Sequence, residues 1–231
     1  MLLKTAIADF SHFIFPRLCA GCGNDTVSDL TPLCWRCIDR MPVTNFNRYA
    51  GNPVEKIFWG RIDISAAASL LEFTDGSVVQ RILHEIKYRG NKDLGYFMGR
   101  LMALFLMKSP RFSAVDALVP LPLFASREKR RGYNQATLLC NGLASATSIP
   151  VFEKAVGRVQ ATATQTHKSR VDRWMNMDGK FMVMDQQLLA GRHLLLVDDV
   201  LTTGATLEAC GSILLSAKPA SLSIASLAYT V

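Results

Sequence analysis

The sequence predicts an α/β protein: a mostly parallel sheet with helices on both faces, plus a small four-cysteine unit near the N-terminus. The chain has 231 residues, 49% of them hydrophobic, which is enough to bury a full core. Strand-like and helix-like segments alternate along it, as is typical of βαβ units. Four of its six cysteines fall within residues 19–37. These three observations carry the prediction.

The expected elements follow in order along the chain. Residues 3–14 repeat apolar side chains at helical spacing and predict an amphipathic helix that ends at Pro16. The segment NRYAGNP, residues 47–53, predicts a linker. Strands are predicted at residues 64–73, 116–123, 193–200 and 220–230. Helices are predicted at residues 77–90, 94–107, 203–217 and, after a short loop, within 131–147.

We expect two units, residues 1–50 with the N-terminal helix and the cysteines, and residues 51–231 with the sheet. Residues 155–173 carry little apolar periodicity, and a long polar loop inside an α/β domain is usually functional. No apolar run approaches the ~18 residues of a membrane span. Because Asp9 and His12 interrupt the N-terminal apolar segment and no cleavage site follows, we expect a cytoplasmic protein.

The net charge of +7 is unevenly placed. Residues 81–131 carry eleven Lys and Arg against four Asp and Glu, which accounts for the whole excess. Such a basic region indicates a polyanionic partner, either the phosphates of a small ligand or nucleic acid. A solvated basic surface would give the same count.

The four clustered cysteines form two CxxC pairs separated by eleven residues. Four thiolates in this arrangement predict a closed, structural Zn²⁺ site made by Cys19, Cys22, Cys34 and Cys37. An iron–sulfur cluster would also accept four thiolates, and disulfides would need an oxidising compartment. Cys140 and Cys210 lie in apolar helical segments and are expected in the core.

The segment HLLLVDDVLTTGAT places two carboxylates, Asp198 and Asp199, at the end of a buried strand. In a parallel sheet this end faces the N-terminus of the next helix, where backbone N–H groups and hydroxyls bind phosphate. The paired carboxylates suit vicinal ribose hydroxyls or a magnesium ion. The segment therefore predicts a site for a ribose 5-phosphate.

LLLVDDVLTTGAT resembles the phosphoribosyl diphosphate (PRPP) signature of type I phosphoribosyltransferases. Together with IKYRGN, VPLPL, RRGYNQA, QTHKSRVDRWMN and the four-cysteine unit, it resembles the ComF family of bacterial competence proteins over nearly the whole chain. The resemblance implies a zinc ribbon joined to a phosphoribosyltransferase fold. It also implies PRPP with Mg²⁺ as ligand, and a role in handling incoming DNA in some members.

The resemblance also implies roles for individual residues. It places the ribose hydroxyls on Asp198 and Asp199, and it makes Lys168 and Arg170 of the loop that closes over PRPP further catalytic candidates, beside Gln165 and Arg173. The 5-phosphate falls on Thr202, Thr203, Gly204, Ala205 and Thr206. The pyrophosphate loop offers Arg127, Arg130 and Arg131. Phe124 stands where ComF members commonly carry a histidine, and Thr202 stands where some purine-using relatives carry an acid.

Two functions stay open at this point. The chain could transfer the phosphoribosyl group to an unidentified nucleophile, or it could bind PRPP without transfer and contact single-stranded DNA or other competence proteins. For DNA we expect weak, sequence-independent binding with phosphate contacts from Lys87, Arg89 and Lys92, which lie away from the ribose-phosphate turn in the sequence. Tyr88 and Tyr133 are the candidates for base stacking, and packing would explain them equally.

Overall fold

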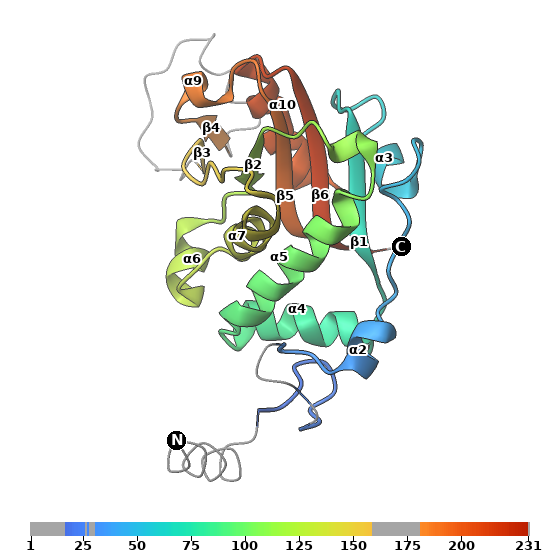
Figure 1. Ribbon diagram of the computed structural model, residues 1–231. Coiled ribbons are helices and arrows are strands. Elements are labelled where there is room, and N and C mark those ends of the chain that lie inside the picture. Colours follow the sequence, from blue (N-terminus) through green and yellow to red (C-terminus); the bar gives the residue numbers. More distant parts are fainter. Residues whose placement is uncertain (1–16, 26, 28–30, 159–180, 231) are drawn as a thin grey trace.

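The computed structural model describes residues 17–25, 27, 31–158 and 181–230 (Figure 1). The helix expected at residues 3–14 and most of the loop expected at 155–173 lie outside the described residues. Among the described residues, no helix combines the length and apolar character needed to cross a membrane.

The predicted parallel sheet is confirmed. It has four strands, and each pairs in parallel with its neighbour. In spatial order the strands are β1 (Ala66–Phe73), β6 (Ser221–Thr230), β5 (His193–Leu201) and β2 (Ala117–Pro120). The last strand is shorter than expected and ends at Pro120, although the backbone N–H of Leu121 still donates to the backbone oxygen of Val197 in β5.

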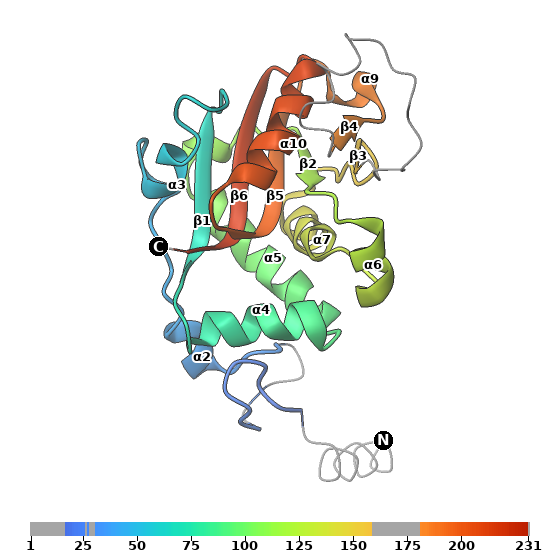
Figure 2. The same cartoon turned by 180° about the vertical axis from the view of Figure 1, so that it is seen from behind.

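Strand β5 lies inside the sheet, and its sequence explains why. Residues 194–197 are all buried, and neighbouring side chains of a strand point to opposite faces. Leu195 and Val197 pack into the core beneath α4 (Val78–Tyr88), α5 (Lys92–Leu106) and α7 (Gln135–Thr147). Leu194 and Leu196 pack into the core beneath α10 (Ala205–Ser216). Figures 1 and 2 show these helices on the two faces of the sheet, as the sequence predicts.

The four long helices have clear starting signals. They are α4 (Val78–Tyr88), α5 (Lys92–Leu106), α7 (Gln135–Thr147) and α10 (Ala205–Ser216). The side chains of Ser77, Asn91 and Asn134 accept hydrogen bonds from backbone N–H groups of the first turns of α4, α5 and α7. A Cβ on Gly142 would lie 2.1 Å from the backbone oxygen of Tyr96, so this glycine lets α5 and α7 pack in backbone contact.

Several short elements are absent from the sequence-based expectation. They are α2 (Trp35–Asp39), α3 (Pro53–Lys56), η1 (Pro110–Phe112), α6 (Ala125–Arg131), α9 (Gln186–Leu189), β3 (Val156–Arg158) and β4 (Phe181–Val183). β3 and β4 form an antiparallel pair. The polar loop expected from residue 155 therefore begins with a strand, and Ala155 and Val156 are buried.

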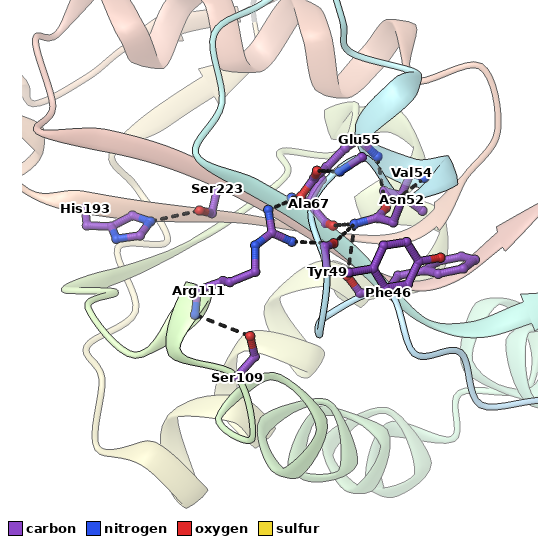
Figure 3. A network of polar contacts seen from close by, with 11 residues as sticks. Phe46, Tyr49, Asn52, Val54, Glu55, Ala67, Ser109, Arg111, His193 and Ser223 are labelled. Carbon is purple, nitrogen blue, oxygen red and sulfur yellow. Dashed lines mark hydrogen bonds and ion pairs between the residues drawn. The ribbon is translucent and has the colours of Figure 1, made fainter.

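The linker expected at residues 47–53 is wrong. Asn52 is fully buried, and its side-chain amide donates hydrogen bonds to the backbone oxygens of Phe46 and Ala67 (Figure 3). The carboxylate of Glu55 accepts from the backbone N–H of Ala67 and forms an ion pair with Arg111. Asn52, one of the polar residues that suggested a linker, thus belongs to a buried network that fixes α3 against β1.

Both outer strands of the sheet are paired with other parts of the chain. Val43 forms an antiparallel bridge with Leu71 of β1, and Val151 forms a parallel bridge with Leu118 of β2. The hydrogen bond from the N–H of Glu72 to the backbone oxygen of Pro42 extends the first of these.

Candidate functional site

The expected strand–turn–helix unit is present at the carboxyl end of β5. Asp198 and Asp199 are half-buried in the strand, and α10 begins at Ala205. A small cavity of about 50 Å³ lies over the turn between them, and it is lined by Asp198 and residues 200–207. The turn thus brings together the five residues that the sequence assigned to a phosphate.

The turn is fixed by a distant part of the chain. Gly204 has φ of +74°, and a Cβ there would lie 2.6 Å from Cγ2 of Ile57, so both backbone conformation and space require glycine. Arg61 Nη1 donates a hydrogen bond of 2.9 Å to the backbone oxygen of Thr203, and Arg61 also pairs with Glu208. Sequence reasoning missed Arg61, because nothing local connects it with a turn 142 residues away.

A second cavity of about 170 Å³ adjoins the first, and the two share Asp198 and Thr206 in their walls. Four cationic side chains line it beside the carboxylate pair: Lys87, Arg127, Arg131 and Arg158. The structure thus brings Arg127 and Arg131 to the site as expected, on helix α6 rather than on a loop. Arg130 is exposed and is not among the lining residues.

Several N–H groups of this second cavity have no partner. Among the described residues, the buried side-chain nitrogen atoms without a hydrogen-bond partner are Arg131 Nε, Gln135 Nε2 and Arg158 Nε, and all three residues line this cavity. A buried donor without an acceptor costs roughly 1–3 kcal/mol. The donor set therefore fits a ligand with several acceptor oxygens. Gln135 belongs to the RRGYNQA motif, which is visible in the sequence. Only the fold, however, shows that its side chain lines the cavity.

Arg158 is the cation of this cavity that sequence reasoning missed. Its guanidinium carbon lies 3.5 Å from the ring centroid of Phe124 and 4.9 Å from that of Phe181. Burial and the charge of Arg127 lower its pKa. Phe124 thus provides a stacking surface for this arginine.

Lys87 also belongs to the site. Its Nζ lies 3.2 Å from Oδ2 of Asp199, so a residue that is distant from the ribose-phosphate turn in the sequence lies beside the carboxylate pair in the structure. The end of α4 is fixed to the segment after α6, because the hydroxyl of Tyr133 donates to the backbone oxygen of Ile86. The guanidinium of Arg131 lies 5.4 Å from the ring centroid of Tyr88. The IKYRG and RRGYN motifs therefore pack against each other.

The two aspartates have different electrostatic environments. Burial and the neighbouring charge of Asp199 raise the pKa of Asp198 from 3.8 to about 8, against the opposing effects of the Asp199 N–H group, Lys87 and Arg158. The backbone N–H of Asp199 donates to Oδ1 of Asp198 at 2.7 Å. Without a ligand, therefore, burial and the charge of Asp199 favour the protonated form of the Asp198 carboxyl group.

The four N-terminal cysteines lie together as predicted. Their sulfur atoms are all within 4.8 Å of one another, and Cys22 Sγ lies 3.8 Å from Cys34 Sγ. Tetrahedral Zn–S bonds of ~2.3 Å place sulfurs ~3.8 Å apart, so this geometry fits zinc. Burial would raise the pKa of Cys19, but the backbone N–H groups of Cys34, Cys22 and Gly21 lower it to about 7. The cluster can hold a metal ion.

Other expected residues are placed as follows. Cys140 and Cys210 are fully buried free thiols, as predicted, and burial raises the pKa of both. Lys168 and Arg170 lie outside the described residues, as do Gln165 and Arg173.

The comparison with known proteins identifies relatives over most of the chain. A family model described as a phosphoribosyl transferase domain matches residues 130–230. DNA utilization protein YhgH of Escherichia coli is 28% identical over 218 residues, which cover 93% of this chain and 91% of that protein. Competence protein F of Haemophilus influenzae is 28% identical over 88% of this chain and 86% of that protein. Competence protein ComFC of Bacillus subtilis is 30% identical over 65% of this chain and 60% of that protein.

Among solved structures, the chain is similar to a glutamine PRPP amidotransferase from B. subtilis complexed with ADP and GMP. The sequence identity is 16% and the TM-score is 0.45, over 62% of this chain. The match spans 30% of the length of that enzyme, so it carries no inference about its activity.

The raised pKa of Asp198 predicts a pH-dependent stability cost. In the unfolded chain the carboxyl group ionises near its ordinary pKa of 3.8, whereas in the folded protein it ionises near 8, so stability falls as the pH rises between these values. Asp198→Asn removes the ionisation. In metal-free protein we therefore expect this variant to gain more in melting temperature at pH 9 than at pH 5.

Thermal unfolding of both proteins in EDTA at these two pH values measures the difference. Asp63→Asn, at an exposed position, is the matched control and should change neither value by much. An equal gain for Asp198→Asn at both pH values would contradict the prediction.

Proposed function

We propose that this chain is a ComF-type protein, as its motifs and its relatives indicate, and that it binds PRPP together with Mg²⁺ at the carboxyl end of β5. One observation carries the proposal. Two cavities share Asp198 and Thr206, and one contains a helix N-terminus while the other contains unpaired N–H donors and four cations. A molecule with a phosphate at one end, a diol in the middle and a pyrophosphate at the other matches this order of groups.

The 5-phosphate is assigned to the turn that opens α10. The exposed hydroxyls of Thr202 and Thr203 and the backbone N–H groups at the start of this twelve-residue helix provide the donors, together with Gly204, Ala205 and Thr206. Helix N-termini favour phosphate because their N–H groups are unpaired and the helix dipole is positive there.

The ribose hydroxyls and Mg²⁺ are assigned to Asp198 and Asp199. Carboxylate oxygens are the ligands that Mg²⁺ prefers, so the donor set fits the ion. A bound magnesium ion would neutralise charge on the departing pyrophosphate.

The pyrophosphate is assigned to the second cavity. Arg127, Arg131 and Arg158 supply positive charge, and Gln135 supplies an amide donor. Arg130 lies outside the cavity wall and would act only at longer range. Lys168 and Arg170 remain candidate catalytic residues on sequence grounds.

The reaction class follows from the ligand. Transfer would break the bond between ribose C1 and pyrophosphate and form a bond to a nucleophile. The alternative is a protein that binds PRPP without transfer and uses it to regulate contact with DNA or with other competence proteins. Release of pyrophosphate from PRPP and Mg²⁺, measured with candidate acceptors, separates the two.

Residues 1–50 are proposed to form a unit held by one structural Zn²⁺, and residues 51–231 the PRPP-binding domain. A cytoplasmic location is proposed with it, because four cysteines can hold Zn²⁺ only where their thiols stay reduced. The four-cysteine cluster shares a core with α4, since Leu33 and Cys34 pack with Val79 and Ile82.

Two variants test the PRPP site. Thr203→Val removes one hydroxyl donor from the turn, and Arg158→Met replaces the stacked guanidinium with an apolar chain that still fits between two rings. Each loses a hydrogen bond to a charged group, worth ~1.5–3 kcal/mol, so we expect PRPP affinity to fall about 10- to 150-fold.

Calorimetric titration of PRPP in saturating Mg²⁺ measures this loss. Lys129→Met, an exposed position on the same helix as Arg127, is the control and should bind like the parent. If both variants keep the parent affinity, PRPP does not bind at these cavities.

The metal site has its own test. Protein purified without added metal should contain near one equivalent of zinc, because four clustered thiolates form a closed tetrahedral site. Cys34→Ser should lose the metal and lower the melting temperature, since metal binding is coupled to folding of the unit. Metal analysis by mass spectrometry measures the zinc content. Iron with a visible chromophore, or no metal at all, would refute the zinc assignment.

Single-stranded DNA binding is a second candidate, supported by Tyr88. This side chain is 61% exposed and lies beside Arg131 and His84, an arrangement suited to base stacking. The names of the relatives from E. coli and H. influenzae concern DNA utilization and competence.

For DNA we expect weak, sequence-independent binding that falls with salt. Tyr88→Ala should weaken it by ~1–3 kcal/mol without changing the salt slope. Arg89→Ala combined with Lys92→Ala should reduce the slope of log affinity against log salt by about 1.4, at ~0.7 per contact. Fluorescence titration of a labelled oligonucleotide at several salt concentrations measures both, and unchanged affinity and slope would show that this surface is only solvated.

A further inference from the structure

The carboxylate pair of the site has a built-in counter-ion. Lys87 Nζ lies 3.2 Å from Asp199 Oδ2, with the side chains 23% and 14% exposed. No other ion pair to Asp198 or Asp199 occurs among the described residues. The ammonium group therefore lies against the carboxylate to which Mg²⁺ is assigned above.

The backbone that carries Lys87 is fixed on both sides. The preceding residue, Ile86, accepts a hydrogen bond from Tyr133, and the ring of the following residue, Tyr88, lies beside Arg131. Movement of the ammonium group is thus limited to what the flexible lysine side chain allows. Within that reach lies the second cavity, because Lys87 is one of its lining residues.

A lysine and a magnesium ion compete for the same carboxylate. At short distance two cations in a half-buried site repel each other strongly, because solvent screens their charges less there than in bulk water. Mg²⁺ can bind Asp199 strongly only if the ammonium group moves away, and the ammonium then needs another oxygen acceptor. The oxygens of a pyrophosphate in the second cavity would provide one.

We propose that Lys87 makes the binding of Mg²⁺ and of the phosphorylated ligand mutually dependent. In the free protein it pairs with Asp199 and opposes binding of the bare cation. When both ligands bind, it exchanges from Asp199 to phosphate oxygens. The inference rests on the proposed PRPP site, and by reciprocity each ligand must raise the affinity of the other by the same factor.

Calorimetry on Lys87→Met and the parent tests this role. With MgCl₂ alone, we expect the variant to bind the ion more tightly, by about tenfold, because the competing ammonium is gone. With PRPP in saturating Mg²⁺, we expect the variant to bind more weakly, so the factor by which Mg²⁺ raises PRPP affinity should shrink. Lys87→Arg, which keeps the positive charge, should retain most of the coupling.

Lys129→Met removes an equal charge from an exposed position and should change neither affinity. Damage to the fold cannot mimic the result, since a gain in Mg²⁺ affinity is not expected from a disordered site. If Lys87→Met does not fold, Lys87→Gln provides the same test.

Unchanged Mg²⁺ affinity, or full coupling in Lys87→Met, would overturn the inference. A parent protein that binds no PRPP at any Mg²⁺ concentration would instead refute the proposed function, and the titrations with MgCl₂ alone would still show whether Lys87 opposes the cation.

Discussion

Repulsion between two adjacent carboxylates constrains the architecture around β5. Asp198 and Asp199 follow directly on a buried run, so they enter a region where charge is poorly solvated. Two features reduce the repulsion. The pKa of Asp198 is raised, so its carboxyl group stays protonated to higher pH, and Asp199 forms an ion pair with Lys87. Cationic side chains from α4, α6 and β3 converge on this end of the strand, and that convergence requires the packing of the surrounding helices.

The turn that follows the carboxylates depends equally on remote parts of the chain. The buried network of Asn52, Glu55 and Arg111 anchors α3 to β1, as Figure 3 shows. The chain leaving α3 then brings Ile57 against Gly204 and Arg61 against Thr203. A short element near the edge of the sheet thereby determines the shape of the turn before α10, which lies far along the sequence.

The strand, the turn and the helix of this unit were predictable because their signals are local. An unbroken apolar run followed by paired acids, small hydroxyl residues and glycine has few structural solutions, and the CxxC pairs are similarly self-contained. The sequence did not identify three site residues: Arg61, Gln135 and Arg158. The residues around a cation or an amide in the sequence do not indicate which distant residues will lie beside it in the fold. Polar composition was misleading at residues 47–53, where Asn52 forms hydrogen bonds in the interior instead of in solvent. For the same reason Lys87, read as part of a basic surface, pairs with a carboxylate of the site.

The pairing of both outer strands has a consequence for assembly. Where Pro42 and Val43 lie along β1, and Val151 lies along β2, the backbone groups that a foreign strand would use are occupied within the chain. Over those residues the sheet cannot be continued by strand addition from a partner or from a second copy, which also removes a common route to aggregation. At those positions an associating protein must therefore recognise side chains on the surface and cannot gain affinity from main-chain hydrogen bonds to the sheet.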